Sequence, residues 1–203
     1  MIDPALTTDA ALATWVDEQA DEAARVQSAV RDMSPTLIAL ARALSASLAA
    51  GGQAFFFGNG GSAADAQHWA AELSGRFFFD RPSLAGHALT TNSSAVTAIG
   101  NDYGFEHIFS RPLAGAGRPG DVALGISTSG TSANVVRAFE TARERGMVTI
   151  GFCGGSPDRF ADLCDHVVAV PSNNTARVQE GHELAAHLVF GIVERLLFGA
   201  GPA

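Results

Sequence analysis

The chain has 203 residues, of which 47% are hydrophobic and 17% charged, and its formal net charge is −8 at pH 7. This length and apolar content suffice for the core of one domain, whereas a negative charge without a basic stripe argues against direct nucleic-acid binding. All 13 basic residues are arginines, which excludes mechanisms that need a catalytic lysine, such as Schiff-base chemistry and Walker-type phosphoryl transfer.

The sequence carries no recognisable signal for secretion or membrane insertion. Acidic residues and threonines stand at the N-terminus, where a signal peptide has a basic region and an apolar core, and no apolar run reaches the length of a membrane span. Cys153 and Cys164 follow no pairing pattern, which is typical of free thiols in a reducing compartment. We therefore expect a cytoplasmic protein without a membrane partner.

Helical patterns come first along the chain, and strands follow. Residues 9–30 and 34–50 read as helices, divided at Ser34-Pro35, and are expected to cap a sheet or to form a subunit interface. Strands are then predicted near 53–57, 85–89, 121–126, 147–152 and 166–170, and helices near 62–75, 92–99, 105–113, 131–145 and 175–198. This alternation predicts βα units and a parallel sheet covered on both faces.

A hydroxyl-rich loop follows the third predicted strand. Residues 127–132 read Ser-Thr-Ser-Gly-Thr-Ser and directly precede a helical stretch. Free amides and hydroxyls at a helix N-terminus favour phosphate oxygens, because the helix dipole attracts anions there. A plain helix cap with a turn is the alternative, although a cap needs only one hydroxyl. The loop therefore indicates a phosphorylated ligand.

A second loop of this kind follows the first predicted strand. Residues 58–62 read Gly-Asn-Gly-Gly-Ser and lead into the helix near 62–75. The loop lacks the lysine of a P-loop and the spacing of a dinucleotide-binding fingerprint. Two such loops in one chain are hard to attribute to turn chemistry alone, so we expect both to contact the ligand.

Two predicted helices carry reactive side chains at helical spacing. His68 and Glu72 are four residues apart and share one helical face, and Gln179, Glu183 and His187 form a similar stripe on the last helix. The first pair is close enough to bind one metal ion or one substrate, and polar residues of the second set are costly if that stripe faces the core. The alternative for the first set is a solvated pair, and for the second an amphipathic helix with incidental histidines. His182 is a rival to the second set.

Five segments together resemble one known family. They are 58–68 (Gly-Asn-Gly-Gly-Ser-Ala-Ala-Asp-Ala-Gln-His), 72–76 (Glu-Leu-Ser-Gly-Arg), 101–104 (Asn-Asp-Tyr-Gly), 126–130 (Ile-Ser-Thr-Ser-Gly) and 177–180 (Arg-Val-Gln-Glu), followed by His187. In order and spacing they are similar to the phosphoheptose isomerases among the sugar-isomerase (SIS) domain proteins. The similarity runs from about residue 50 to 195 and is more specific than any single motif.

The resemblance implies an α/β fold, a three-layer sandwich with a five-stranded parallel sheet. Residues 1–203 are then a single SIS domain, with N-terminal helices over 1–50 that pack at the subunit interface and the sandwich over 51–198. A homotetramer with active sites between subunits is implied. The implied reaction converts sedoheptulose 7-phosphate to D-glycero-D-manno-heptose 7-phosphate by enediol proton transfer, with one zinc ion per subunit as cofactor.

The resemblance also implies roles for individual residues. The implied metal ligands are His68, Glu72, Gln179 and His187, and the implied acid–base pair is Glu72 with His187. The implied substrate and phosphate contacts are Asn59, Gly60, Gly61, Ser62, Glu72, Asn101, Asp102, Ser127, Thr128, Ser129, Ser132 and Gln179. Thr131 departs from the family, in which Asn is common, and so does Glu183, a charge at a position expected to be apolar. A carboxylate there either adds a metal ligand or supports one.

A non-catalytic function shares this fold and is the alternative. Some SIS proteins that resemble the isomerase bind the replication initiator, and others sense sugar phosphates in regulators. Such a protein keeps its phosphate loops while losing the acid and the base. Glu72 and His187 are both present, which favours the enzyme.

Overall fold

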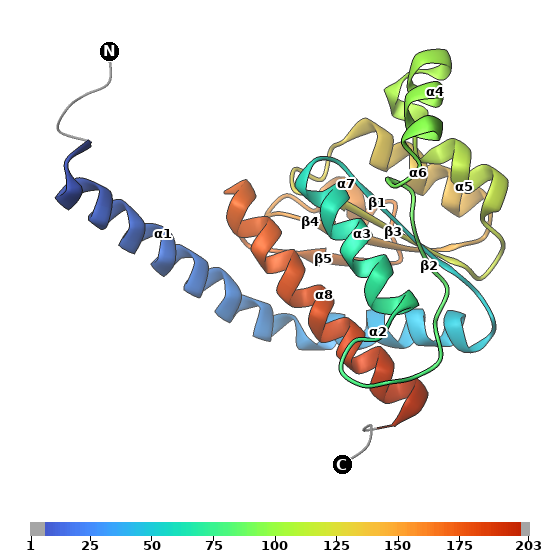
Figure 1. Ribbon diagram of the computed structural model, residues 1–203, viewed down its shortest axis with the longest axis horizontal. Helices are drawn as coiled ribbons and strands as arrows, with labels where there is room; N and C mark the ends of the chain where they lie inside the picture. Colours follow the sequence, from blue (N-terminus) through green and yellow to red (C-terminus); the bar gives the residue numbers. More distant parts are fainter. Residues whose placement is uncertain (1–6, 200–203) are drawn as a thin grey trace.

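The computed structural model describes residues 7–199 (Figure 1). Five parallel strands form one sheet in the order β2-β1-β3-β4-β5. They are β1 (Ala54–Gly58), β2 (Gly86–Ala88), β3 (Val122–Ser127), β4 (Val148–Cys153) and β5 (His166–Ala169). The strand order reverses between β1 and β3, and in open α/β sheets ligands bind beyond the carboxyl ends of the strands at such a point.

Alternate strand residues divide the core between the two faces of the sheet. On β1, Phe56 packs into one cluster with Leu124 and Phe152, whereas Phe55 and Phe57 pack into the cluster on the other face. Side chains of successive strand residues point to opposite faces, so a strand covered on both sides is apolar throughout. This burial explains the unbroken apolar run of β1.

Helices cover both faces and complete three layers (Figure 1). One face packs against α2 (Ser34–Ala49), α3 (Gly61–Ser74) and α8 (Thr175–Phe198). The other face packs against the segment that contains α4 (Ser93–Tyr103), η3 (Phe105–His107), α5 (Ser110–Ala116) and α6 (Ala133–Glu144), together with the short α7 (Asp158–Ala161). The predicted three-layer α/β sandwich with a five-stranded parallel sheet is confirmed.

The first helix leaves this sandwich. α1 (Asp9–Val30) projects away from the body and continues through η2 (Arg31–Met33) into α2 (Figure 1). Only its last turns pack on the rest of the chain, since Val26 and Val30 are its buried residues. α2, in contrast, packs on the sheet. This agrees with one of the two roles expected for the N-terminal helices, that of capping the sheet.

Two local predictions differ from the structure. The helix expected over 105–113 is divided into η3 and α5, because Pro112 has no amide hydrogen to continue a helix through Ile108. The short α7 was not predicted. No helix among residues 7–199 is long and apolar enough to cross a bilayer.

Candidate active site

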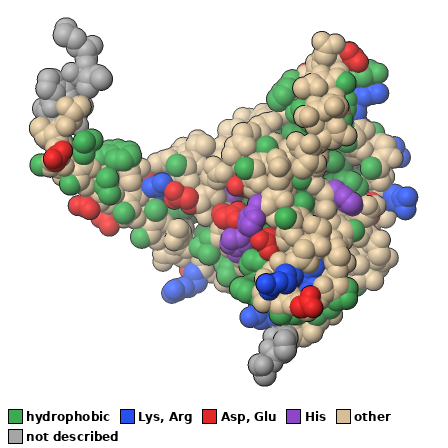
Figure 2. Space-filling model, in the orientation of Figure 1, with side chains coloured by type: hydrophobic (Ala, Val, Ile, Leu, Met, Phe, Trp, Pro, Cys, Tyr) green, Lys and Arg blue, Asp and Glu red, His purple; other side chains and the backbone are tan. Residues whose placement is uncertain are grey.

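Two histidines from distant parts of the chain meet between α3 and α8. His68 Nε2 on α3 lies 3.0 Å from His187 Nε2 on α8, although 119 residues separate them in sequence. Glu72, one turn after His68, places a carboxylate oxygen 3.5 Å from the same His68 nitrogen. In Figure 2, histidine (purple) and acidic (red) side chains gather on this face of the molecule.

The three side chains form a group suited to a cation. One ligand atom from each of His68, Glu72 and His187 lies within 4.8 Å of the other two. All three are partly open to solvent, so a substrate has access to them. Imidazole nitrogens and a carboxylate oxygen are donors that zinc accepts. The structure thus brings together three of the four predicted metal ligands.

Gln179, the fourth predicted ligand, is held by a neighbouring acid. Its Nε2 donates to both carboxylate oxygens of Asp65, at 3.1 and 3.2 Å. Burial is the main reason why the pKa of Asp65 lies above its ordinary value, and this hydrogen bond opposes the shift. A Cβ at Gly61 would lie 2.5 Å from the Gln179 amide, so a larger residue there would displace that side chain. Metal binding by Gln179 stays a prediction.

His182, the rival histidine, belongs to the core. It is completely buried, and its Nε2 donates to the carbonyl of Cys153 at 3.0 Å. Burial lowers the pKa of His182 to about 4, so the ring is neutral at pH 7. It packs against the ring of Phe152 on the sheet side of α8. His182 therefore has a structural position away from the cluster.

The hydroxyl-rich loop follows β3 directly and forms a network of its own. The Ser127 hydroxyl lies 2.8 Å from that of Ser132 and 3.3 Å from that of Ser129. Ser132 occupies the N-cap of α6, yet its side chain makes no capping bond to the helix. Gly130 allows the turn with a φ of +70°. A hydroxyl cluster turned away from capping argues against the plain helix-cap alternative.

The glycine loop after β1 is hydrogen-bonded to α6, the helix that follows the hydroxyl-rich loop. Asn59 and Asn134 exchange two amide hydrogen bonds of 2.9 and 2.8 Å. Because β1 and β3 are neighbours at the reversal of strand order, both loops meet at the edge where ligands bind in such sheets. A hollow of about 170 Å3 includes Asn59 and Gly60, and one of about 280 Å3 includes Thr128 and Ser129.

Other predicted substrate contacts lie at the margins. Ser62 is buried near the start of α3. Asn101 and Asp102 are exposed in the last turn of α4, where the Asn101 amide donates to the Asp102 carboxylate at 2.8 Å. α4 projects from the sandwich (Figure 1). Their contact with substrate stays a prediction.

Comparisons with known proteins place this chain in a family. The SIS domain family model matches residues 19–154. A phosphoheptose isomerase from Rhodospirillum rubrum is 52% identical over 166 residues, which cover 82% of this chain and 88% of that protein. The chain belongs to the phosphoheptose isomerase family. A phosphoheptose isomerase from Burkholderia pseudomallei (strain K96243) is 47% identical over 92% of this chain and 96% of that protein.

A solved structure agrees with this family. That of phosphoheptose isomerase from Neisseria gonorrhoeae has a TM-score of 0.85 and 41% identity, and the match covers 90% of this chain and 98% of that one. The family resemblance predicted from five short segments is therefore confirmed over most of the chain.

Two side-chain contacts of this phosphoheptose isomerase family member were not predicted from the sequence. The indole of Trp69 donates to Glu183 at 2.8 Å, and Asp65 holds Gln179. Each contact joins α3 to α8, and its two residues are more than a hundred positions apart in the sequence. A local sequence pattern therefore could not predict either contact. The one signal was Glu183 itself, a charge in an apolar stretch of helix.

Proposed function

We propose that the protein is an aldose–ketose isomerase that converts sedoheptulose 7-phosphate to D-glycero-D-manno-heptose 7-phosphate. Membership of the phosphoheptose isomerase family supports this reaction. The observation that carries it is the meeting of Glu72 with His187, whose ligand atoms lie within 4.8 Å although they come from different helices. A protein that only bound sugar phosphates would have no use for a carboxylate and an imidazole placed together.

The pair has the chemistry that enediol formation needs. A base removes the proton from C1 of the ketose, and an acid delivers a proton to the carbonyl oxygen at C2. The Glu72 carboxylate is suited to the first task and the His187 imidazole to the second, since an imidazole takes and gives protons near neutral pH. Protonation at C2 and loss of the proton from the C1 hydroxyl then yield the aldose.

The two loops at the sheet edge are suited to the phosphate and the sugar chain. Hydroxyls of Ser127, Ser129 and Ser132 converge at the N-terminus of α6, a position that favours an anion. Binding energy gained at the remote phosphate orients the reacting carbons. This division assigns binding to the loops and proton transfer to the helices.

We also propose that His68, Glu72 and His187 hold a divalent metal, and that the metal is zinc at about one ion per subunit. Two imidazoles and a carboxylate are zinc donors, and their ligand atoms already converge. The bound ion supplies a Lewis acid that polarises a carbonyl or hydroxyl oxygen of the substrate. Gln179 is the predicted fourth ligand.

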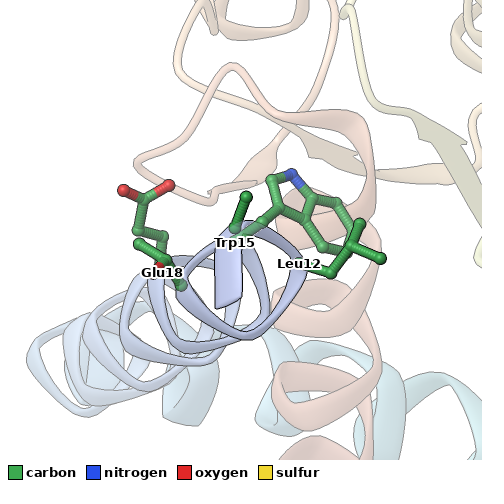
Figure 3. Close-up of a pocket in the computed structure, with 5 residues that line it drawn as sticks. Leu12, Trp15 and Glu18 are labelled. Carbon is green, nitrogen blue, oxygen red and sulfur yellow. The ribbon is translucent and has the colours of Figure 1, made fainter. Parts of the chain in front are cut away.

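A homotetramer is proposed from the exposed face of α1. Leu12, Trp15 and Val16 are 48%, 58% and 56% exposed, and Figure 3 shows the side chains of Leu12 and Trp15 next to each other on that helix. A large apolar patch on a projecting helix is typical of a protein interface. The partner that fits is another copy of the chain, with active sites between subunits.

We also propose that residues 1–203 form one SIS domain, which the packing of α2 and α8 on the sheet supports. Action in the cytoplasm is supported by the free thiols of Cys153 and Cys164.

The test is turnover followed directly. Purified full-length protein is incubated with sedoheptulose 7-phosphate in D2O, and NMR follows the aldose phosphate and deuterium at its C2. We expect both to accumulate, because the enediol is protonated from exchangeable groups. Tight binding of the ketose phosphate without any aldose would instead identify a non-catalytic SIS protein.

A further inference from the structure

Glu183 lies between the two histidines of the cluster. Its Oε1 is 3.0 Å from His68 Nε2 and 3.0 Å from His187 Nε2, while the two nitrogens are themselves 3.0 Å apart. The three atoms are therefore the corners of an almost equilateral triangle. Sequence reasoning expected an apolar side chain at this position, so the carboxylate is a departure that needs a reason.

Hydrogen bonds alone do not satisfy this triangle. A neutral imidazole carries at most one hydrogen at Nε2, and an ionised carboxylate oxygen only accepts. Two hydrogens serve at most two of the three edges, and the third edge then brings two lone pairs or two hydrogens together. A cation among the three atoms removes the conflict, because each atom turns a lone pair toward it.

The size of the triangle suits a transition-metal ion. In a tetrahedral zinc site with bonds of 2.0–2.1 Å, ligand atoms lie about 3.3 Å apart, close to the three edges here. Three protein ligands with an open fourth position are typical of catalytic zinc. His68, Glu183 and His187 therefore match one face of a coordination tetrahedron.

A buried tryptophan holds the Glu183 carboxylate in this orientation. Trp69 is completely buried, and its Nε1 donates to Glu183 Oε2 at 2.8 Å, which leaves Oε1 for the histidines. Outer partners of this kind orient metal ligands and raise metal affinity. Gln179 donates to Asp65 through its amide nitrogen, a contact that does not involve its Oε1. The carboxylate of Glu183 is thus fixed at the triangle by a buried partner.

We propose that Glu183 is a metal ligand of this protein, together with His68 and His187. The inference rests on the proposal above that the cluster binds a divalent metal, and it revises the ligand set proposed there. With Glu183 as the carboxylate ligand, Glu72 is not needed as one, and a carboxylate bound to a cation is a weaker base. Glu72 is then available for proton transfer.

Zinc affinity of the full-length protein tests this. Chelator-stripped wild type, Glu183→Leu, Gln179→Ala and Trp69→Phe are titrated with Zn2+ by calorimetry, and with Co2+ followed by visible absorption. Glu183→Leu is expected to lose more than about 100-fold in zinc affinity, beyond the 10–100-fold of an outer partner. Trp69→Phe should lose roughly tenfold. Gln179→Ala should lose less zinc affinity than Glu183→Leu, because it leaves all three atoms of the triangle in place.

Thermal unfolding in chelator shows whether each variant folds. Glu183→Leu leaves the buried indole N–H of Trp69 without its acceptor, so we expect a lower unfolding temperature than wild type but a single cooperative transition that shows a folded protein. Wild-type affinity in Glu183→Leu, or equal losses in Glu183→Leu and Gln179→Ala, would overturn the proposal. Failure of wild type to bind Zn2+ would overturn the metal proposal as well. Isomerisation of sedoheptulose 7-phosphate, measured on the same samples, reports separately on the proposed reaction.

Discussion

Arg81 and Glu194 form a buried ion pair that locks the end of α3 onto α8. Arg81 Nε lies 3.0 Å from Glu194 Oε1, and the two side chains are 1% and 2% exposed. The guanidinium also donates to the carbonyls of Glu72, Leu73 and Gly75, the last turn of α3. The pair therefore fixes the helix that carries His68 relative to the helix that carries His187.

Breaking this pair should destabilise the whole protein. Burial alone would raise the pKa of Glu194, but hydrogen bonds from the Phe78 and Phe77 amides and from Arg81 outweigh it, and the pKa lies below its usual value. Glu194→Gln leaves a buried guanidinium without its anion, so we expect a loss of about 3–5 kcal/mol in unfolding free energy. Urea denaturation of wild type and Glu194→Gln measures this loss of unfolding free energy.

The matched control for that change is Glu140→Gln. Glu140 pairs with Arg137 at 3.5 Å, but both side chains are well exposed. A surface pair contributes roughly 0–1 kcal/mol. Equal destabilisation by the two variants would show that the buried pair has no special role.

The proposed acid and base should each be essential for turnover. We expect Glu72→Gln and His187→Ala to lower kcat by about 10²–10⁴-fold, because each removes one proton-transfer group. The double variant should lose little more, since both groups act on one proton path. Circular dichroism and the unfolding temperature show whether the fold persists. Near-normal rates in both variants would refute the assignment, and Glu144→Gln, an exposed change on α6, is the control.

The hydroxyl-rich loop should recognise phosphate. In Ser129→Ala with Ser132→Ala, we expect affinity for sedoheptulose 7-phosphate to fall at least about tenfold, since a hydrogen bond to a charged group contributes roughly 1.5–3 kcal/mol before water compensates. Affinity for unphosphorylated sedoheptulose should hardly change. Calorimetry measures the affinity of each variant for both sugars. The control is Ser93→Ala on α4, which should bind both sugars as wild type does. If the double variant still prefers the phosphorylated sugar as strongly as wild type, the loop is only a helix cap.

His182 should make stability depend on pH. Because its pKa falls to about 4 in the fold, the unfolded chain binds a proton between about pH 6.5 and 4 that the native protein does not. Stability is therefore lost as the pH drops through that window. Between pH 7 and pH 5, protonation linked to His182 lowers the unfolding free energy by about 2 kcal/mol.

The check is denaturation at both pH values with chelator present. His182→Gln should lose about 2 kcal/mol less than wild type on this acidification, whereas a change at the exposed His87 to Gln should leave the wild-type difference. An unchanged pH dependence in His182→Gln would mean that another group accounts for it.

The exposed residues of α1 should be needed for assembly. We expect Trp15→Ser to shift the protein from tetramer to smaller species in light scattering after size exclusion, because the indole is 58% exposed and exposed aromatic side chains are typical of interfaces. Asp17→Ser, also exposed on α1, should keep the wild-type mass. A monomeric wild type would contradict the tetramer itself.

Strands and loops were predictable because their signals are local. The apolar run before Gly58 marks β1, and the run of hydroxyls after Ile126 marks the turn into α6. The break at Pro112 was also visible as a residue type, but the helical periodicity around it outweighed it in the prediction.

Contacts between distant segments were beyond such reasoning. Nothing near Glu183 indicates that it reaches Trp69, and nothing near Arg81 indicates its pairing with Glu194. Each contact depends on how α3 and α8 dock, which side-chain packing decides rather than helical spacing. The resemblance to a family supplied residues on both helices and marked Glu183 as a departure, but it did not show which atoms Glu183 contacts.

The projecting half of α1 has a consequence for how the protein behaves on dilution. Residues 12–18 are exposed in the part of the chain that the structure describes, and isolated helices of that length are only marginally stable in water. If α1 pairs with another copy of the chain as proposed, association stabilises the helical structure of these turns. Far-ultraviolet ellipticity of this protein should accordingly weaken at low concentration, before the sheet unfolds.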